Sequence, residues 1–233
     1  MCGRFVLTTP ADAIAAEFAA MTGGLVLRPR YNIAPMQDVV VVRAVDGRRT
    51  LCVLRWGLIP FWAKDPAIAS RLINARSESA AEKPSFREAM KKRRCIVPAS
   101  GFYEWRKEGK RNQPWYFRPS RPTALLAMAG LWERWRDPEG EITETCCLLT
   151  TDANPVLAPV HDRMPVLLDR HGVERWLDPA EGDPEKLSDL LVPAPEAQLE
   201  GHPVSTAVNS VRNDDARNIE EIEQGDPAQG RLV

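Results

Sequence analysis

Short runs of β-branched and aromatic residues, joined by tight turns rather than by helical crossovers, constrain this fold more than any other feature. Residues 39–45 and 50–56 flank Asp46-Gly47, a pair that favours the two-residue turn of a β-hairpin. Strands joined by such short turns pair antiparallel. We therefore expect an α+β fold, a single compact domain with a β-rich, barrel-like, mainly antiparallel core and peripheral short helices. The other expected strands are residues 2–7, 95–98, 102–106, 114–118, 124–131, 143–150 and 164–168.

Helical patterns lie between these strands. A first helix is expected from Pro10 to about residue 21, with Thr9 as its N-cap and Gly23-Gly24 as its stop. Residues 76–92 also have a helical pattern, but Pro84 predicts two short pieces or a kink there. Short helices are also expected at residues 172–177 and 184–191.

The domain organisation follows from length and composition. A chain of 233 residues could hold two domains, but neither a repeat nor a linker divides this one. We expect one domain over residues 2–213 and a polar, loosely ordered tail over residues 214–233. The net charge of −1 excludes a protein that coats nucleic acid by bulk attraction, although it permits a local basic groove. Basic clusters at residues 28–30, 91–94 and 106–111 fit either such a groove or ordinary solvated faces.

The chain lacks an apolar run of about 18 residues and the layout of a secretory signal, so we expect a cytoplasmic protein without membrane contact. The five cysteines are an odd number, which argues against a disulfide framework. Adjacent Cys146 and Cys147 would point to opposite faces of a strand, and the three histidines are dispersed. We therefore expect neither a metal site nor a cofactor.

Cys2 follows the initiator methionine, and its small side chain permits removal of Met1. The new N-terminus would then carry an amine and a thiol on adjacent carbons, with ordinary pKa values of about 8 and about 8.5. Such a pair traps aldehydes, because the amine forms an imine and the thiol then closes a thiazolidine ring. The alternative is an ordinary buried cysteine, which is usually inert.

Asn74, Arg76 and Glu78 alternate along residues 73–78, so an extended chain would place them on one face. Asparagine and arginine offer N–H donors suited to phosphate or sugar oxygens. The alternative is that Asn74 caps a helix whose charges are solvated.

Two further segments suggest acid–base chemistry. Glu104 lies among three aromatic residues in 101–105, where burial would raise its pKa and suit it to general acid catalysis. An outward-facing glutamate on an edge strand is the alternative. His161 has Asp162 and Arg163 beside it and an apolar run just beyond, and it fits either a catalytic or a structural role.

The segment 56–62 is rich in aromatic residues and also holds Gly57 and Pro60, which favours a rigid loop. Exposed rings there could stack on bases or wedge between them. The alternative places Trp56 and Trp62 in the core, and we favour it for Trp56.

Several blocks of residues occur in a fixed order along most of the chain. They are Met-Cys-Gly-Arg-Phe at 1–5, Arg-Tyr-Asn-Ile-Ala-Pro at 30–35, Arg-Trp-Gly-Leu-Ile-Pro at 55–60, Ile-Asn-Ala-Arg-Ser-Glu at 73–78, Gly-Phe-Tyr-Glu-Trp at 101–105, His-Asp-Arg-Met-Pro at 161–165 and Pro-Val-Ser-Thr-Ala-Val-Asn at 203–209. In order and spacing these blocks resemble the SOS response-associated peptidase (SRAP) domain family. The resemblance implies a protein that captures abasic sites in single-stranded DNA, with a basic groove ending at the N-terminal cysteine. We also expect a monomer.

The resemblance also implies roles for individual residues. Cys2 matches the crosslinking residue, Glu104 the acid that moves protons and His161 the residue that assists at the sugar. Asn74 and Arg76 match residues that hold the N-terminus and the DNA backbone beside the lesion. Positions expected to contact phosphates and bases are Arg4, Phe61, Trp62 and Arg163, with Phe61 standing where the family often has a tryptophan.

Two other classes of function are compatible with a cysteine next to Met1. Class II glutamine amidotransferases also start with Met-Cys-Gly and use the free α-amine as the base for the cysteine, but their glutamine-binding blocks are not found here. A non-catalytic single-strand binder with a buried Cys2 is the other alternative. The SRAP-like reading further implies self-processing at Met1 and a nucleoid location when the protein is bound to DNA.

Overall fold

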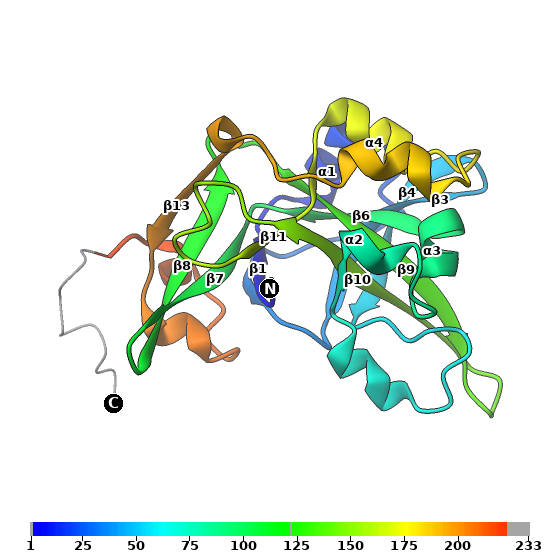
Figure 1. Cartoon of the computed structure of the whole chain (residues 1–233), viewed down its shortest axis with the longest axis horizontal. Coiled ribbons are helices and arrows are strands. Elements are labelled where there is room, and N and C mark those ends of the chain that lie inside the picture. Colours follow the sequence, from blue (N-terminus) through cyan, green and yellow to red (C-terminus); the bar gives the residue numbers. More distant parts are fainter. Residues whose placement is uncertain (1, 122, 223–233) are drawn as a thin grey trace.

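The computed structural model describes residues 2–121 and 123–222. Its strands form a closed barrel and a five-stranded sheet, which lie side by side in one compact domain (Figure 1). Nearly all strand pairs are antiparallel. The exceptions are the parallel pairs that β10 (Ile142–Asp152) makes with β4 (Arg48–Trp56) and β5 (Asn74–Arg76). The expected α+β class with a β-rich core is confirmed.

The barrel consists of five strands in the order β10, β4, β3, β6, β9. It closes because β9 (Leu126–Arg136) pairs with both β6 (Arg94–Ala99) and β10. The predicted hairpin joins β3 (Asp38–Val45) to β4, and Asp46 and Gly47 take φ values of 49° and 75° as its turn requires. Two short strands extend this sheet, β11 (Arg163–Pro165) on β10 and β12 (Leu167–Leu168) on β9.

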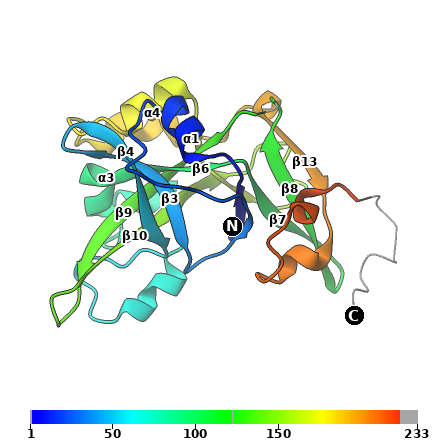
Figure 2. The same ribbon diagram turned by 180° about the vertical axis from the view of Figure 1, so that it is seen from behind.

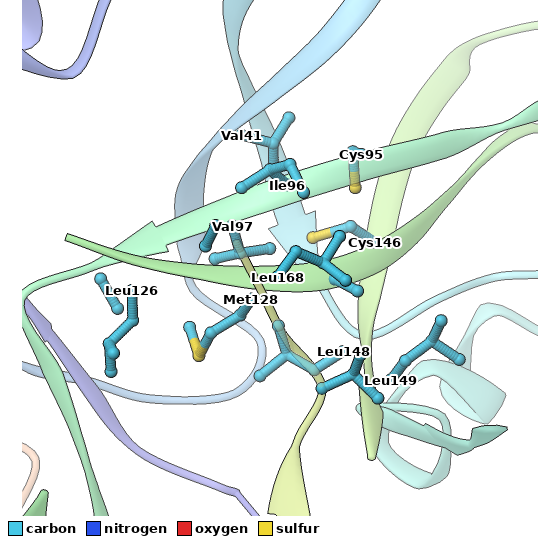
Figure 3. Packing of buried hydrophobic residues seen from close by; sticks show 14 of the residues in the cluster. Val41, Cys95, Ile96, Val97, Leu126, Met128, Cys146, Leu148, Leu149 and Leu168 are labelled. Carbon is cyan, nitrogen blue, oxygen red and sulfur yellow. The ribbon is translucent and has the colours of Figure 1, made fainter. Parts of the chain in front are cut away.

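Apolar side chains fill the barrel. Every residue of β6 is buried, because one face points into the barrel and the other is covered from outside. Figure 3 shows Cys95 and Cys146 within this packing, beside Val97, Met128 and Leu148. The interior is therefore a packed core rather than a channel.

The five-stranded sheet has the order β13, β8, β7, β1, β2. One face packs toward the barrel, and the other is covered by the segment after β13, drawn in orange and red (Figure 2). Val204, Val208 and Ile219 of that segment pack on Tyr103 and Tyr116. The strands are β1 (Phe5–Leu7), β2 (Arg30–Ile33), β7 (Gly101–Glu108), β8 (Arg111–Pro119) and β13 (Leu199–Pro203).

The first helix differs from its prediction. The helix α1 (Ala11–Glu17) has Pro10 rather than Thr9 at its N-cap, and it ends before residue 21. It ends early because Met21 pairs with β4, donating its N–H to Arg49 O at 2.9 Å and accepting from Leu51 N at 2.9 Å. A pairing partner from elsewhere in the chain thus outweighs local helix propensity.

The other helices follow the predicted pattern. Pro84 lies between two short helices, α2 (Ser77–Ala80) and α3 (Arg87–Lys92), as expected. The helix α4 (Arg170–Trp176) packs against β6 and β12. The 3-10 helices are η1 (Pro66–Arg71), η2 (Pro184–Leu190), η3 (Glu196–Gln198), η4 (Thr206–Asn209) and η5 (Ala216–Ile219).

The beginning of the predicted tail packs on the domain. Asp214 accepts hydrogen bonds from Arg30 Nε, at 2.9 Å, and from the Tyr31 main chain. Ile222 donates its N–H to Pro203 O at 3.0 Å. Residues 214–222 are therefore held, and the rest of the predicted tail, residues 223–233, lies outside the described residues. Within the described part of the chain, no helix is long and apolar enough to cross a membrane.

Candidate active site

Cys2 lies just before β1, where the five-stranded sheet meets the barrel, and its side chain is 0% exposed. The thiol is 3.8 Å from Arg4 O. Burial, and after it the Glu104 carboxyl, raises the pKa of this thiol far above its ordinary value. The sulfur is therefore protonated at neutral pH, and any reaction at this atom needs a proton acceptor.

Asn74 holds the main chain at Cys2. Its Nδ2 donates to Cys2 O at 2.8 Å, whereas its Oδ1 is buried without a hydrogen-bond partner among the described residues. Asn74 and Arg76 share a face of β5, but Glu78 lies in α2, so the extended pattern ends before it. The alternative of a helix cap at Asn74 is wrong, because Arg76 occupies the N-cap position of α2.

Glu104 is buried beside Cys2. Its strand β7 lies between β8 and β1, so the alternative of an outward glutamate on an edge strand is wrong. The side chain is 2% exposed, and burial raises the pKa of Glu104 to about 7. Because this pKa is close to neutral pH, the protonated and the ionised forms of Glu104 are both populated there.

Gly101, in the same strand, allows β7 to lie close to β8, since a Cβ there would lie 2.5 Å from Phe117 O.

His161 lies in the loop between β10 and β11. Its Nδ1 accepts the Arg163 N–H at 2.9 Å, which places the proton of the neutral ring on Nε2. Asp162 Oδ1 is also 2.9 Å from Nδ1 and would favour an imidazolium, but it belongs to a largely exposed side chain. Burial prevails and lowers the pKa of His161. The Asp162 carboxylate also helps to raise the pKa of Glu104, which places this loop near Glu104.

Arg4 lies on the other face of the five-stranded sheet. Its Nη1 donates to Asn32 Oδ1 at 2.6 Å and to Val208 O at 2.9 Å, and its guanidinium lies 5.8 Å from the centre of the Trp105 ring. These contacts attach the start of the chain to the C-terminal segment. Contact of Arg4 with DNA stays a prediction.

Arg163 forms a compact ion-pair cluster. Its Nη1 donates to Glu78 Oε1 at 2.6 Å and to Asp152 Oδ1 at 2.7 Å. Its Nη2 donates to Glu78 Oε2 at 2.9 Å and to Thr150 O at 2.7 Å. The expected contact of Arg163 with DNA also stays a prediction, and these partners compete with it.

The expected aromatic loop presents two rings to solvent. Phe61 and Trp62 are 52% and 47% exposed, and Trp62 Nε1 donates to Pro84 O at 3.2 Å. Trp56 is buried, as favoured from the sequence, and its Nε1 donates to Ile73 O at 2.9 Å. Arg76 is exposed and makes no ion pair within residues 2–121 and 123–222. These exposed groups are available to a ligand.

The sequence reasoning missed two residues that support the site. Asn32 is fully buried and donates from Nδ2 to the carbonyls of Val208, Ser210 and Asn213, at 3.2, 3.0 and 2.6 Å. A polar residue in an otherwise strand-like block was the available signal. Asp152, at the end of β10, carried no such signal in the sequence, because its role depends on a hydrogen bond from Arg163, which lies 11 positions further along the chain.

In the described segments, no group of three or more His, Cys, Asp and Glu side chains is arranged to hold a metal ion. The fold and site thus define a single-domain protein with a buried cysteine next to its N-terminus and an acid, an amide and an imidazole nearby.

This architecture matches a known family. Residues 1–211 match the SRAP family, described as "SOS response associated peptidase", and the chain belongs to that family. It is 41% identical over 224 residues to the abasic site processing protein YoqW of Bacillus subtilis, covering 94% of this chain and 99% of that protein. It is 36% identical over 231 residues to the abasic site processing protein HMCES of Gallus gallus, covering 86% and 68%. A crystal structure of a protein from Bacteroides thetaiotaomicron is similar with a TM-score of 0.86 and 28% identity, covering 95% of this chain and all of that one. The expected family is confirmed.

Proposed function

We propose that this protein processes abasic sites, capturing the open aldehyde of the sugar in single-stranded DNA through Cys2 after Met1 has been removed. The observation that carries the proposal is the pairing of a buried Cys2 with Glu104, whose pKa is about 7. The names of the relatives from Bacillus subtilis and Gallus gallus support the same substrate.

The first step opens the sugar ring. An abasic deoxyribose is mainly a closed hemiacetal, so a proton must reach the ring oxygen and another must leave the anomeric hydroxyl. Glu104 suits both transfers because its two protonation states coexist near neutral pH. His161, neutral and with its proton on Nε2, can donate a hydrogen bond to a sugar oxygen.

The covalent steps then use both groups of Cys2. The α-amine attacks the aldehyde carbon and, with proton transfers through Glu104, water leaves to give an imine. The sulfur adds to the imine carbon while its proton passes to the nitrogen, either directly or through the Glu104 carboxylate. The products are one thiazolidine and one water molecule. Asn74 fixes the carbonyl of Cys2 and so limits the rotation of the reacting end.

DNA binding falls to exposed groups outside this buried centre. Arg76 is exposed and can meet a phosphate, whereas Phe61 and Trp62 offer rings on which bases can stack. Arg4 Nη1 is bound to Asn32 and Val208 and its Nε is buried, so a contact of Arg4 with the DNA backbone would use Nη2. Sequence preference is not expected, since the target is a missing base.

Met1 must leave before the amine of Cys2 can react. Self-cleavage assisted by Glu104, or an aminopeptidase acting on the small Cys2 side chain, would achieve this. We further propose that the protein acts as a monomer in the cytoplasm, at the nucleoid when it is bound to DNA.

Intact mass spectrometry and a crosslinking assay test the proposal together. Purified protein lacking Met1 should form a heat-stable adduct with a single-stranded oligonucleotide that holds one abasic site. The control is the same oligonucleotide after borohydride reduction of the aldehyde, which should not react. An adduct with the reduced site, or an equal yield from protein that retains Met1, would contradict the mechanism. Release of ammonia from glutamine would instead favour an amidotransferase.

A further inference from the structure

Both terminal nitrogens of the Arg163 guanidinium are fully committed inside the protein. Nη1 and Nη2 each carry two N–H donors, and the contacts to Glu78, Asp152 and Thr150 supply an acceptor for each of them. Nε is buried without a hydrogen-bond partner among the described residues, and the whole residue is 9% exposed. The guanidinium therefore has no donor left to offer a phosphate at the surface.

The acceptors of Arg163 belong to separate parts of the chain. Glu78 is in α2, directly after the strand that carries Asn74 and Arg76. Thr150 and Asp152 are in β10, where Thr150 is the register partner of Arg76. The guanidinium thus joins the segment of Asn74 to the far end of β10.

The main chain of Arg163 makes the second connection. Its N–H donates to His161 Nδ1 at 2.9 Å, and its strand pairs with β10 at Asp152. One residue therefore sets the orientation of the imidazole through its backbone and holds the segment of Asn74 through its side chain. Arg163 thus contacts His161 directly and the segment of Asn74 through Glu78, although these two parts of the proposed mechanism are far apart in sequence.

The paired hydrogen bonds between the Arg163 guanidinium and the Glu78 carboxylate fix the orientation of these groups more than they stabilise the fold. Glu78 and Asp152 have side chains that are 51% and 80% exposed, so solvent screens their attraction to Arg163. A planar guanidinium that binds both oxygens of one carboxylate nevertheless fixes their relative orientation.

We infer that Arg163 is a positioning residue, which holds His161 and the Asn74 segment in register through Glu78 and does not contact DNA. This inference rests on the proposed function. It assigns to Glu78 a part in the same arrangement, because both carboxylate oxygens of Glu78 accept hydrogen bonds from Arg163.

The test separates reaction rate from DNA binding in Arg163→Lys and Glu78→Gln. Lysine can still meet a phosphate as a point charge, but it cannot reproduce the bidentate fork. Single-turnover crosslinking to an abasic oligonucleotide gives a maximal rate and a half-saturating DNA concentration. Affinity for an undamaged single strand, measured from about 50 to about 200 mM salt, gives the number of phosphate contacts.

We expect both variants to lower the maximal rate by about 10- to 100-fold, the range caused by small misplacement of reacting groups. Their salt dependence should equal that of the wild type, whereas Arg76→Gln should reduce the slope by about 1. Arg175→Gln, which breaks an exposed bidentate pair with Asp189, is the matched control and should change neither property. Circular dichroism melting confirms folding, and Glu78→Gln covers the case in which Arg163→Lys unfolds.

Three results would decide otherwise. Arg163→Gln, which also removes the charge, is measured beside Arg163→Lys and Glu78→Gln. A lower salt slope in Arg163→Gln, with an unchanged maximal rate, would make Arg163 a phosphate contact and overturn the inference. Wild-type rates in both Arg163→Lys and Glu78→Gln would overturn it while leaving the proposed function intact. A wild-type protein without Met1 that forms no adduct would overturn both.

Discussion

Cys2 and the barrel cysteines are equally buried but have different neighbours. Cys2, Cys95, Cys146 and Cys147 are all at most 1% exposed, and burial raises the pKa of each thiol. Cys95 and Cys146 lie among apolar side chains (Figure 3), and Cys147 belongs to the same apolar cluster. Cys2 instead has the Glu104 carboxyl as the second cause of its raised pKa and the Asn74 amide on its carbonyl. Burial alone therefore does not distinguish Cys2 from the barrel cysteines, whereas a neighbouring carboxyl whose pKa is about 7 does.

The largest expected difference comes from removing one thiol from each region. Cys2→Ala should reduce the heat-stable adduct by about 10³-fold or more, in the range found when a nucleophile is removed. Cys146→Ala should react at the wild-type rate and lose about 1 kcal/mol of stability, because it leaves a small gap in the barrel. Gel analysis of the adduct and thermal melting measure the two effects. Equal loss of adduct in both variants would remove the distinction between the regions.

Replacing Glu104, the carboxyl that distinguishes Cys2 from the barrel cysteines, should lower the crosslinking rate but raise the folding stability above neutral pH. Glu104→Gln should slow crosslinking by about 100-fold, as expected when a general acid is lost. The native pKa of about 7 lies above the ordinary 4.5, so the folded protein binds the proton more tightly than the unfolded chain. Wild-type stability therefore falls as the pH rises from about 4.5 to about 7, by a total of about 3 kcal/mol. Above that range Glu104→Gln should be the more stable protein by a similar amount, and near pH 4.5 the two should be alike.

Glu133→Gln is the matched control for this pH dependence. Glu133 is also buried, but its Oε2 accepts from Arg93 Nη2 at 2.8 Å. Removing its charge should destabilise the protein at neutral pH by about 1–3 kcal/mol, which is the opposite sign. Chemical denaturation of the three proteins across pH measures the difference. A Glu104→Gln variant less stable than the wild type above pH 7 would show that the Glu104 carboxylate is stabilised in the native state.

The smallest expected effect concerns the exposed rings outside the buried centre. Trp62→Ala should weaken binding to undamaged single-stranded DNA by about 1–3 kcal/mol, the contribution of one stacked base. Its maximal crosslinking rate should be unchanged, because the ring takes no part in the chemistry. Val53→Ala removes an exposed apolar side chain from β4 and should alter neither quantity. Fluorescence anisotropy measures the affinity, and unaltered binding in Trp62→Ala would exclude stacking at this position.

Local signals predicted what depends on neighbours in sequence. Asp46-Gly47 formed the expected hairpin turn, and Pro84 separated two helices, because both residues restrict their own backbone. Glu104 was expected to have a raised pKa because aromatic residues flank it in sequence, and this was confirmed.

Long-range partners decided what the sequence could not predict. The helix α1 ended early because Met21 found a partner in β4. The neighbours of Arg163 gave no hint that Glu78 and Asp152 would surround its guanidinium. The partners of Arg4 were equally unpredictable, since Asn32 and Val208 lie 28 and 204 positions away in sequence.

The bond between Arg4 and Val208 joins residues at opposite ends of the domain. During translation the segment that carries Cys2 is the first to leave the ribosome, yet its anchor is made some two hundred residues later, at a separation of 204 positions. A chain truncated before Val208 would lack this anchor of Arg4, although it would still contain Asn74 and Glu104, the neighbours of Cys2. The start of the chain is thus anchored by the last part of the described domain, so a change at Val208 would alter contacts two residues from Cys2, at the other end of the sequence.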